Sequence, residues 1–192
     1  MKSDVIEVST SQDNTDLVLE TADRVAGYYS LPEKSAMYLR LLTEEMMGMV
    51  RAIAGEVTGE FWIESEDGKE FALHLKVWKK MDQKAREQLI AASTTGTNEA
   101  HRGFMGKIRA FFEPLDDMPL LLEMGSGEVR TDLTWSMKAY QEQLEEDVRQ
   151  NKSGAKEAWD ALERSVVAHV ADEVKVRIDG YDVEMTAYKK VL

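Results

Sequence analysis

The sequence contains no cysteine and no long apolar run. Without cysteine, neither a disulfide framework nor a thiolate metal site can form. No segment approaches the ~18 consecutive apolar residues that a membrane-spanning helix needs. Residues 1–8 also lack an apolar run of signal-peptide length. We therefore expect a cytoplasmic protein without a membrane partner.

Positive charge is scarce. Lysine and arginine number 24 against 36 aspartates and glutamates, which gives a formal net charge of −12 at pH 7. Such a chain repels a phosphate backbone at long range, so we do not expect a nucleic-acid partner. The same charge also favours solubility, which explains it without any partner. A length of 192 residues suffices for one sizeable domain, or for one domain with an appendage.

Common catalytic and cofactor motifs are missing too. The sequence has no P-loop, no nucleophile elbow and no complete GxGxxG pattern. Its three histidines, His74, His101 and His169, are far apart, and no two have the spacing of a helical metal pair. No metal site is therefore predicted. His74 stands between Leu73 and Leu75, so we expect it on the opposite face of their strand.

The N-terminal third predicts a short strand and two helices. Val5–Val8 is typical of an edge strand, and the apolar repeat of Asp16–Tyr29 is typical of a helix. Ser30 and Glu33 then have the spacing of a capping box, which predicts the start of a longer helix that ends near Gly55. The first helix has the apolar positions Leu17, Leu19, Ala22, Val25, Ala26 and Tyr29. The longer helix has the apolar stripe Leu39, Leu42, Met46, Met49, Val50 and Ile53.

Between Gly59 and Lys80 the apolar period changes to two. Two alternating runs flank Asp67-Gly68, a favoured two-residue turn, and together they predict a β-hairpin. The longer helix is expected to cover the buried face of this hairpin. That face consists of Phe61, Ile63, Phe71, Leu73, Leu75 and Val77.

The rest of the chain alternates between helical, polar and strand patterns. Residues 82–92 and 103–112 are predicted as helices, 93–98 as a loop, 120–122 and 133–137 as strands, and 141–152 as a helix or a linker. One continuous helix is predicted over Lys156–Val170, with Trp159, Leu162, Val166, Val167 and Val170 on one face. A second hairpin is predicted over Val174–Tyr188, with Asp179-Gly180 at its centre.

These patterns predict an α+β fold. We expect a two-layer α/β sandwich with a mixed, mostly antiparallel sheet that helices cover on one face. Residues 1–143 would form the main domain, and 151–192 a C-terminal helix and β-hairpin extension packed on the same core. The extension could lengthen the sheet or cover an edge strand. Its strand edge and apolar helix also suggest a homodimer contact.

Two stretches, together with the order of the elements, carry a family resemblance. Leu31–Val50, which reads LPEKSAMYLRLLTEEMMGMV, is similar to the helix that bears the first ATP motif of the histidine-kinase-type ATPase superfamily. Gly96–Phe112 lies where the glycine-rich lid of that family leads into its next helix, and the hairpin 59–80 stands between the two. Residues 1–143 thus resemble this superfamily, and within it the small serine kinases that act as anti-sigma factors.

The first ATP motif is only partly present. In the family, a glutamate of the long helix positions the attacking water or hydroxyl, and an asparagine four residues later coordinates magnesium. Here Glu44 is followed at that spacing by Gly48, and Glu45 by Met49. The resemblance implies Glu44 or Glu45 as the catalytic base. Adjacent helical residues diverge by about 100°, so at most one of the two can face a pocket.

The other ATP motifs also depart from the family. Its second hairpin strand ends in an aspartate that binds the adenine amino group, followed by spaced glycines. Here 77–82 reads VWKKMD, and only Asp82 could be a displaced equivalent. The lid glycines could bring backbone N–H groups to a phosphate at a helix N-terminus, although glycines also fill ordinary turns. The implied nucleotide-binding residues are Gly48, Asp82, Thr95, Gly96, Thr97, Gly103, Gly106 and Lys107.

Three functions follow from these observations. The first is a regulatory protein with a degenerate ATP-binding fold, which acts through a protein partner or as a sensor of ATP or ADP, without magnesium or catalysis. The second is an active ATP-dependent serine or histidine protein kinase of the anti-sigma-factor type. The third is a structural or assembly module without a nucleotide. The missing asparagine favours the first, because phosphoryl transfer depends on metal-assisted charge neutralisation. The cluster Met46, Met47 and Met49 is compatible with a binding surface, but core packing is favoured.

Overall fold

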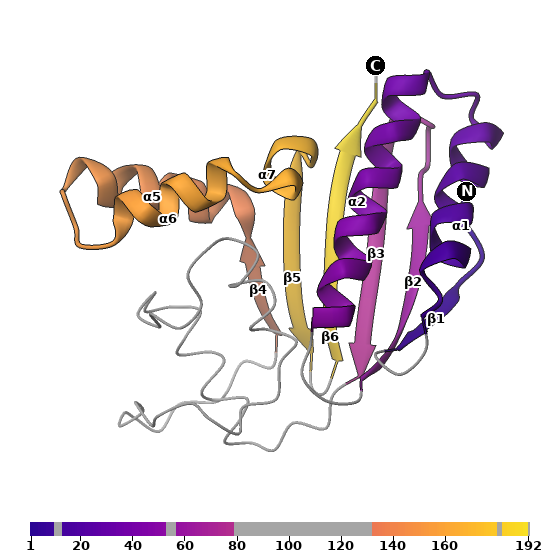
Figure 1. The fold of residues 1–192 in the computed structure, drawn as a ribbon, viewed down its shortest axis with the longest axis horizontal. Coiled ribbons are helices and arrows are strands. Elements are labelled where there is room, and N and C mark those ends of the chain that lie inside the picture. The colour runs from indigo at the N-terminus through magenta and orange to yellow at the C-terminus, as the bar shows by residue number, and fades with distance from the viewer. Residues whose placement is uncertain (10–12, 53–56, 79–131, 180–181, 192) are drawn as a thin grey trace.

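The computed structural model describes residues 1–9, 13–52, 57–78, 132–179 and 182–191 (Figure 1). The N-terminal elements are β1 (Ile6–Ser9), α1 (Thr15–Tyr28), α2 (Glu33–Ala52), β2 (Thr58–Glu64) and β3 (Glu70–Trp78). The C-terminal elements are β4 (Asp132–Ser136), α5 (Met137–Arg149), α6 (Ala155–Glu163), α7 (Val166–Val170), β5 (Glu173–Asp179) and β6 (Asp182–Lys190). The segments predicted at 82–92, 93–98, 103–112 and 120–122 lie outside the described residues.

The six described strands form one sheet in the order β1-β2-β3-β6-β5-β4, and every neighbouring pair is antiparallel. Helices α1, α2 and α7 lie on one face of this sheet (Figure 1). The predicted α+β sandwich is therefore confirmed. In the C-terminal hairpin β5-β6, strand β6 pairs with β3 and so extends the sheet. Strand β4 pairs with β5 on the other side of the hairpin. Both outer edges of the hairpin are thus paired within the chain.

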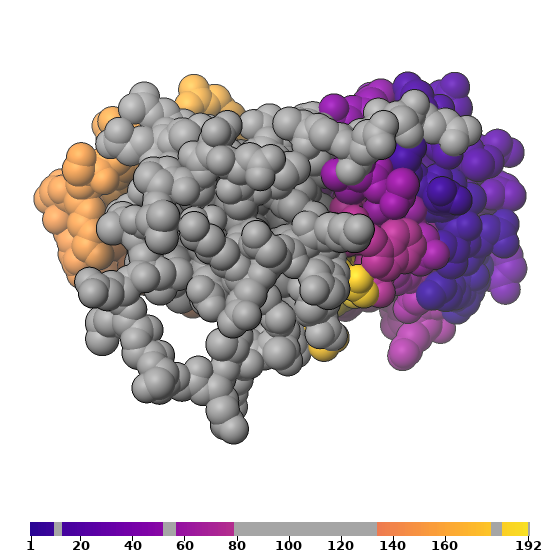
Figure 2. All heavy atoms as spheres, turned by 90° about the horizontal axis from the view of Figure 1, so that it is seen from below, coloured from indigo at the N-terminus to yellow at the C-terminus, as the bar shows by residue number. Residues whose placement is uncertain are grey.

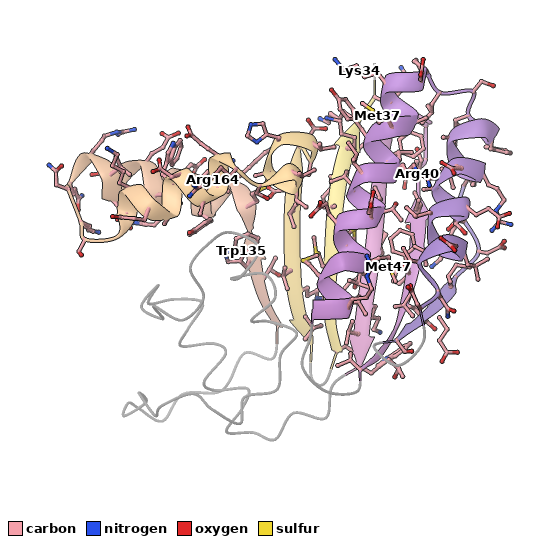
Figure 3. The ribbon with its side chains drawn as sticks, in the orientation of Figure 1. Lys34, Met37, Arg40, Met47, Trp135 and Arg164 are labelled. Atoms are coloured by element: carbon pink, nitrogen blue, oxygen red, sulfur yellow. The ribbon has the colours of Figure 1, made fainter. Side chains whose placement is uncertain are left out.

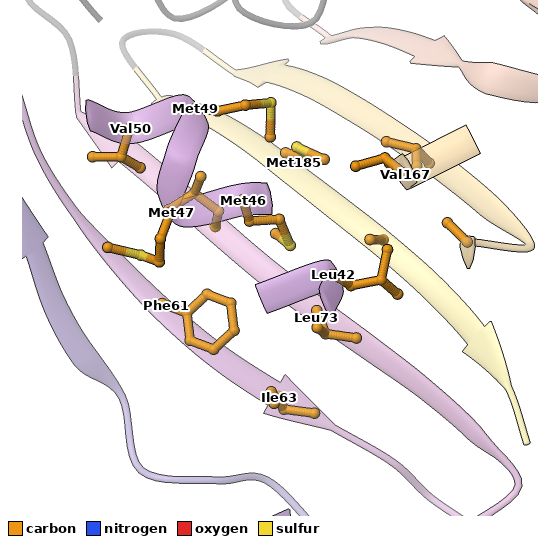
Figure 4. Packing of buried hydrophobic residues seen from close by; sticks show 14 of the residues in the cluster. Leu42, Met46, Met47, Met49, Val50, Phe61, Ile63, Leu73, Val167 and Met185 are labelled. Atoms are coloured by element: carbon orange, nitrogen blue, oxygen red, sulfur yellow. The ribbon is translucent and has the colours of Figure 1, made fainter. Parts of the chain in front are cut away.

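Strand alternation places one face of the sheet in the core. The predicted inward residues of the first hairpin are all buried, with Phe61, Phe71, Leu73, Leu75 and Val77 at 0% exposure. Strands β5 and β6 contribute Val174, Val176, Val183, Met185 and Ala187 to the same cluster. Figure 4 shows this layer beneath α2. Because one continuous cluster joins both halves of the chain, the sheet and its helices share one core.

Helix α2 packs as its stripe predicts. Leu39, Leu42 and Met46 are fully buried, and Met47 and Met49 are exposed by only 1% and 5%. The methionines therefore serve the core, and they lie over the sheet in Figure 4. In α1 the predicted position Leu17 is wrong, because its side chain is 45% exposed and Val18 is buried instead. The buried face of α1 also includes Thr15 and Thr21. Because these side chains are polar, the pattern of apolar residues did not predict that they are buried.

The predicted role of Ser30 is also wrong. Ser30 has φ of 51° and donates its N–H to the carbonyl of Gly27, while Leu31 donates to Ala26. This pair of bonds is a Schellman motif, so Ser30 ends α1 and does not cap α2. The first turn of α2 instead begins with the bond from Ala36 N–H to the carbonyl of Pro32.

The turn between β2 and β3 is wider than the predicted two residues. The loop runs from Ser65 to Lys69, where Ser65 Oγ accepts the N–H of Gly68 and donates to the carbonyl of Glu70. Asp67 Oδ1 accepts the N–H groups of Lys69 and Glu70. Two polar side chains thus replace the backbone pairing of a tight turn. Gly68 is needed there, because its φ is +72° and a Cβ would lie 2.7 Å from Tyr29.

Two predictions for the C-terminal half need correction. Strand β4 ends at Ser136, whose Oγ accepts the N–H of Ala139 and so starts α5 before Met137 can continue the strand. The charged segment after it is a helix, α5. The predicted continuous helix over Lys156–Val170 is two helices, because Ser165 has an extended backbone and caps α7. Val166 is consequently exposed, whereas Val167 is buried.

Candidate functional site

The structure places three of the residues implied in nucleotide binding or catalysis, all on α2. Glu44 is exposed, Glu45 is half-buried, and Gly48 follows Glu44 by about one turn on the same side of the helix. A Cβ on Gly48 would meet no atom within 4 Å. The other implied residues, Asp82, Thr95, Gly96, Thr97, Gly103, Gly106 and Lys107, lie outside the described residues.

The sheet face opposite the core holds the polar side chains. On this outer face, the register of β2, β3, β6, β5 and β4 aligns the outward side chains in rows. One row is Trp62, His74, Thr186, Lys175 and Ser136, and the next is Glu60, Lys76, Glu184, Arg177 and Thr134. Trp62 and Thr186 are only 8% and 7% exposed, although they lie on the face away from the core. The centre of this face is therefore largely shielded from solvent, although polar side chains lie there.

His74 lies at that centre, on the outer face where its place in the alternating sequence predicts it. Its Nδ1 lies 2.8 Å from Glu184 Oε1, and its ring stacks on Trp62 with the centroids 4.7 Å apart and the planes at 2°. A carboxylate only accepts hydrogen bonds, so Nδ1 carries the proton and Nε2 presents a lone pair. The bond from His74 lowers the pKa of Glu184 against an opposing effect of burial.

The Nε2 atom of His74 is buried and has no hydrogen-bond partner; it is the one such side-chain atom among the described residues. Buried polar atoms are nearly always paired, so this exception calls for a physical explanation. A histidine oriented by a carboxylate can accept a proton at its other nitrogen. Within the described parts of the chain, no hydroxyl or thiol is bonded to Nε2, and no group of three metal-ligating side chains is present.

Lys2 lies over the ring of Trp62, the aromatic residue on which His74 stacks. Its Nζ lies 4.5 Å from the centre of the Trp62 ring and 3.2 Å from Glu64 Oε1, which also accepts the indole N–H at 2.8 Å. Burial raises the pKa of Glu64, but the hydrogen bonds from Trp62 and Lys2 outweigh it, and the pKa is lowered overall. Lys2, Trp62, Glu64, His74 and Glu184 form what we call the outer-face network.

Lys76 of the next row forms an ion pair with Asp182 of β6. Lys76 Nζ lies 2.7 Å from Asp182 Oδ2, and this hydrogen bond raises the pKa of Lys76. Both side chains are about one third exposed, so the pair is partly screened by solvent.

A second feature is the pair of helices α5 and α6, which we call the arm. Leu144 of α5 and Leu162 of α6 are buried and belong to the common core cluster, and the rings of Trp135 and Tyr140 pack against each other with their centroids 5.9 Å apart. A shallow groove of about 170 Å³ on the arm is lined by Glu145, Val148, Arg149 and Trp159. Val148 is 38% exposed and Trp159 is half-buried. The arm thus presents apolar surface within a charged surround.

Sequence reasoning predicted the face of His74 but missed its partners. Glu184 is one of many acidic residues, and its alternation in β6 only shows that it points outward. Its contact with His74 depends on the pairing of β3 with β6, which lie more than a hundred residues apart in the chain. The arm was missed because charged residues dominate 141–152.

Comparison with protein-family models finds no match, and comparison with curated proteins finds none either. Among the helices of the described residues, none has the length and apolarity to cross a membrane. The described residues thus define an α+β sandwich with a polar network on the outer face of its sheet and a two-helix arm.

Proposed function

We propose that this protein is a regulatory protein that acts by binding another protein, and that the arm makes the contact. The scaffold would be a degenerate member of the ATPase-type fold that residues 1–143 resemble. The observation that carries the proposal is the apolar groove on the arm, which extends beyond β4 at the edge of the described sheet (Figure 1).

The arm projects from the β4 side of the sheet (Figure 1). The space-filling view places its residues at the opposite end of the molecule from α1 and β1 (Figure 2). Arg164 marks the junction of the arm with α7 (Figure 3). A projecting pair of helices is accessible to a large partner, and exposed apolar side chains with a charged surround are typical of protein interfaces.

The proposed occupant is a partner segment with one large apolar side chain beside basic residues. The groove between Val148 and Trp159 accepts the apolar side chain. Four of the six residues from Glu142 to Asp147 are acidic, and the whole chain carries a net charge of −12, so a basic partner is electrostatically complementary. Arg149 pairs with Glu145 and Glu146 at 3.3 Å, and a basic partner side chain would compete for those carboxylates.

The test places a photo-crosslinking amino acid at Val148, with the same substitution at exposed Leu17 as the control. A partner linked only from Val148 is then purified and its affinity measured by calorimetry. We expect Trp159→Ala to weaken binding at least about tenfold, as loss of a buried aromatic anchor does. Leu17→Ala should have no effect. Equal affinity of Trp159→Ala, or no link specific to Val148, would reject the arm as the contact.

Nucleotide binding is tested separately by calorimetry with ATP and ADP, in magnesium and in EDTA, at concentrations that detect a dissociation constant of about 1 mM. Absence of heat under all conditions leaves the protein-binding function alone. Binding that Glu44→Ala or Glu45→Ala weakens would instead support the nucleotide sensor, and would make a kinase assay the next step.

A further inference from the structure

The segment Met1–Ser3 is held along β2 by backbone bonds. Ser3 donates its N–H to the carbonyl of Ile63 at 2.8 Å, and Ser65 donates to the carbonyl of Met1 at 2.9 Å. The hydroxyl of Ser3 accepts the N–H of Ile63 at 2.9 Å. Lys2 pairs with Glu64 and therefore lies on the outer face. We call Met1–Ser3, held in this way, the latch.

Trp62 lies between the latch and His74. Its strand β2 is flanked by the latch on one side and by β3 on the other, so Lys2 and His74 approach the indole from opposite sides. From the distances of 4.5 Å and 4.7 Å to the ring, the ammonium and the imidazole centre are at most about 9 Å apart. At that separation the charge of one group affects the other directly.

We infer that protonation of His74 loosens the latch, so that the outer-face network acts as a pH-sensitive switch over this edge of the sheet. Two effects of the added proton act in the same direction. The first is electrostatic, since an imidazolium repels Lys2 and draws on the π-electrons of the same Trp62 ring from its opposite face. It also competes with Lys2 for the carboxylate of Glu64.

The second effect is solvation. Protonation places an N–H at Nε2, a buried atom for which the described residues offer no acceptor. An unpaired buried donor is unfavourable, so the protonated state favours an arrangement in which this nitrogen reaches water. The bond from Nδ1 to Glu184 survives protonation and anchors the ring to β6, so the rearrangement falls on the stacked Trp62, which Lys2 of the latch covers.

The other titratable groups around His74 keep their charge as the pH falls from 8 to 5.5. The pKa values of Glu64 and Glu184 are lowered, so both carboxylates stay ionised. Tyr188 stays neutral, because burial raises the pKa of its phenol. The remaining charged neighbours are Lys2, Lys76, Asp182, Lys175 and Arg177. Between about pH 5 and 8, histidine side chains and α-amino groups are the groups that ordinarily change charge. The α-amino group of Met1 donates to the carbonyl of Ser65, so a proton gained there holds the latch more firmly as the pH falls. Loosening of the latch at low pH is therefore assigned to His74.

Amide hydrogen exchange by NMR on the full chain tests the switch. After correction for intrinsic exchange, the opening constants for the amides of Ser3 and Ser65 should rise about threefold to tenfold between pH 8 and 5.5. The amide of Thr43, in buried α2, should not change over this range. His74→Gln should abolish the rise toward low pH, and His169→Gln, at an exposed histidine of α7, should retain it. Wild-type openings that do not vary with pH, or that vary equally in His74→Gln, would overturn the inference.

A second variant keeps the test independent of any change that His74→Gln makes to the fold. Lys2→Met retains the alkyl chain over Trp62 and removes the charge. Because linkage is reciprocal, His74 should then bind its proton about threefold more tightly, as followed through its ring resonances. An unchanged proton affinity in Lys2→Met would show that Lys2 and His74 are not coupled.

Discussion

Gly48 follows Met47 and precedes Met49 in α2, and both methionines are buried. Their size fills the space between helix and sheet, whereas Gly48 turns outward to where a Cβ would meet no atom within 4 Å. Core packing therefore does not explain this glycine. In the family that the sequence resembles, a magnesium-coordinating asparagine follows the catalytic glutamate by four residues, which is the position of Gly48 if Glu44 is the counterpart and of Met49 if Glu45 is.

We predict that Gly48→Ala raises the free energy of unfolding by about 1 kcal/mol, since alanine favours a helix interior over glycine and finds open space here. Denaturant unfolding measures the change. Gly68→Ala is the matched control and should destabilise the protein, because φ of +72° and the contact with Tyr29 both oppose a Cβ. A destabilising Gly48→Ala would show that the position is more crowded than the structure indicates.

At the scale of elements, the most consequential feature of the C-terminal half is the break between α6 and α7. A continuous helix from Lys156 would have kept one face toward the sheet. Instead Ser165 adopts φ of −77° and ψ of 124°, and its Oγ accepts the N–H of Ala168. The break lets α7 pack Val167 and Val170 on the sheet while α6 leaves with α5 to form the arm.

We predict that Ser165→Ala destabilises the protein by about 1 kcal/mol, the usual value of a lost N-cap. Ser165→Thr retains an acceptor oxygen and should lose less. Thermal unfolding of both variants against wild type measures the difference. If Ser165→Ala were as stable as Ser165→Thr, the side chain would not be what separates the two helices.

At the scale of the molecule, β6 lies between β3 and β5, so the last forty or so residues supply two interior strands of the sheet. The chain order therefore does not match the spatial order. A boundary near residue 150 falls at the tip of the arm, where the chain turns back from α5 to α6 (Figure 1).

We predict that a chain ending at Asn151 does not fold, because β3 and β4 each lose a paired neighbour and the core face of β3 loses Met185 and Val183. Circular dichroism and light scattering should show an unfolded or aggregated species. As the control, the fragments 1–151 and 152–192 expressed together should assemble, because the cut leaves every strand intact. A well-folded monomer from 1–151 alone would contradict this sheet order.

The sequence by itself determined the local structure. The alternation in 59–80 and 174–188 predicts both hairpins, and the stripe from Leu39 to Val50 predicts α2 and its buried face. These features follow from the spacing of apolar side chains along the chain, which the local sequence sets. The choice of His74 as an outward residue follows from the same rule.

Only the tertiary structure decided which elements meet. The pairing of β3 with β6 brings Glu184 to His74, and the pairing of the latch with β2 brings Lys2 over Trp62. The role of Ser30 was predicted wrongly, and the role of Ser165 as a helix cap was not predicted. A serine can end a helix, start one or do neither, and the surrounding contacts decide which of these roles it takes. Long-range pairing depends on the sum of many weak contacts across the sheet, so no local pattern specifies it.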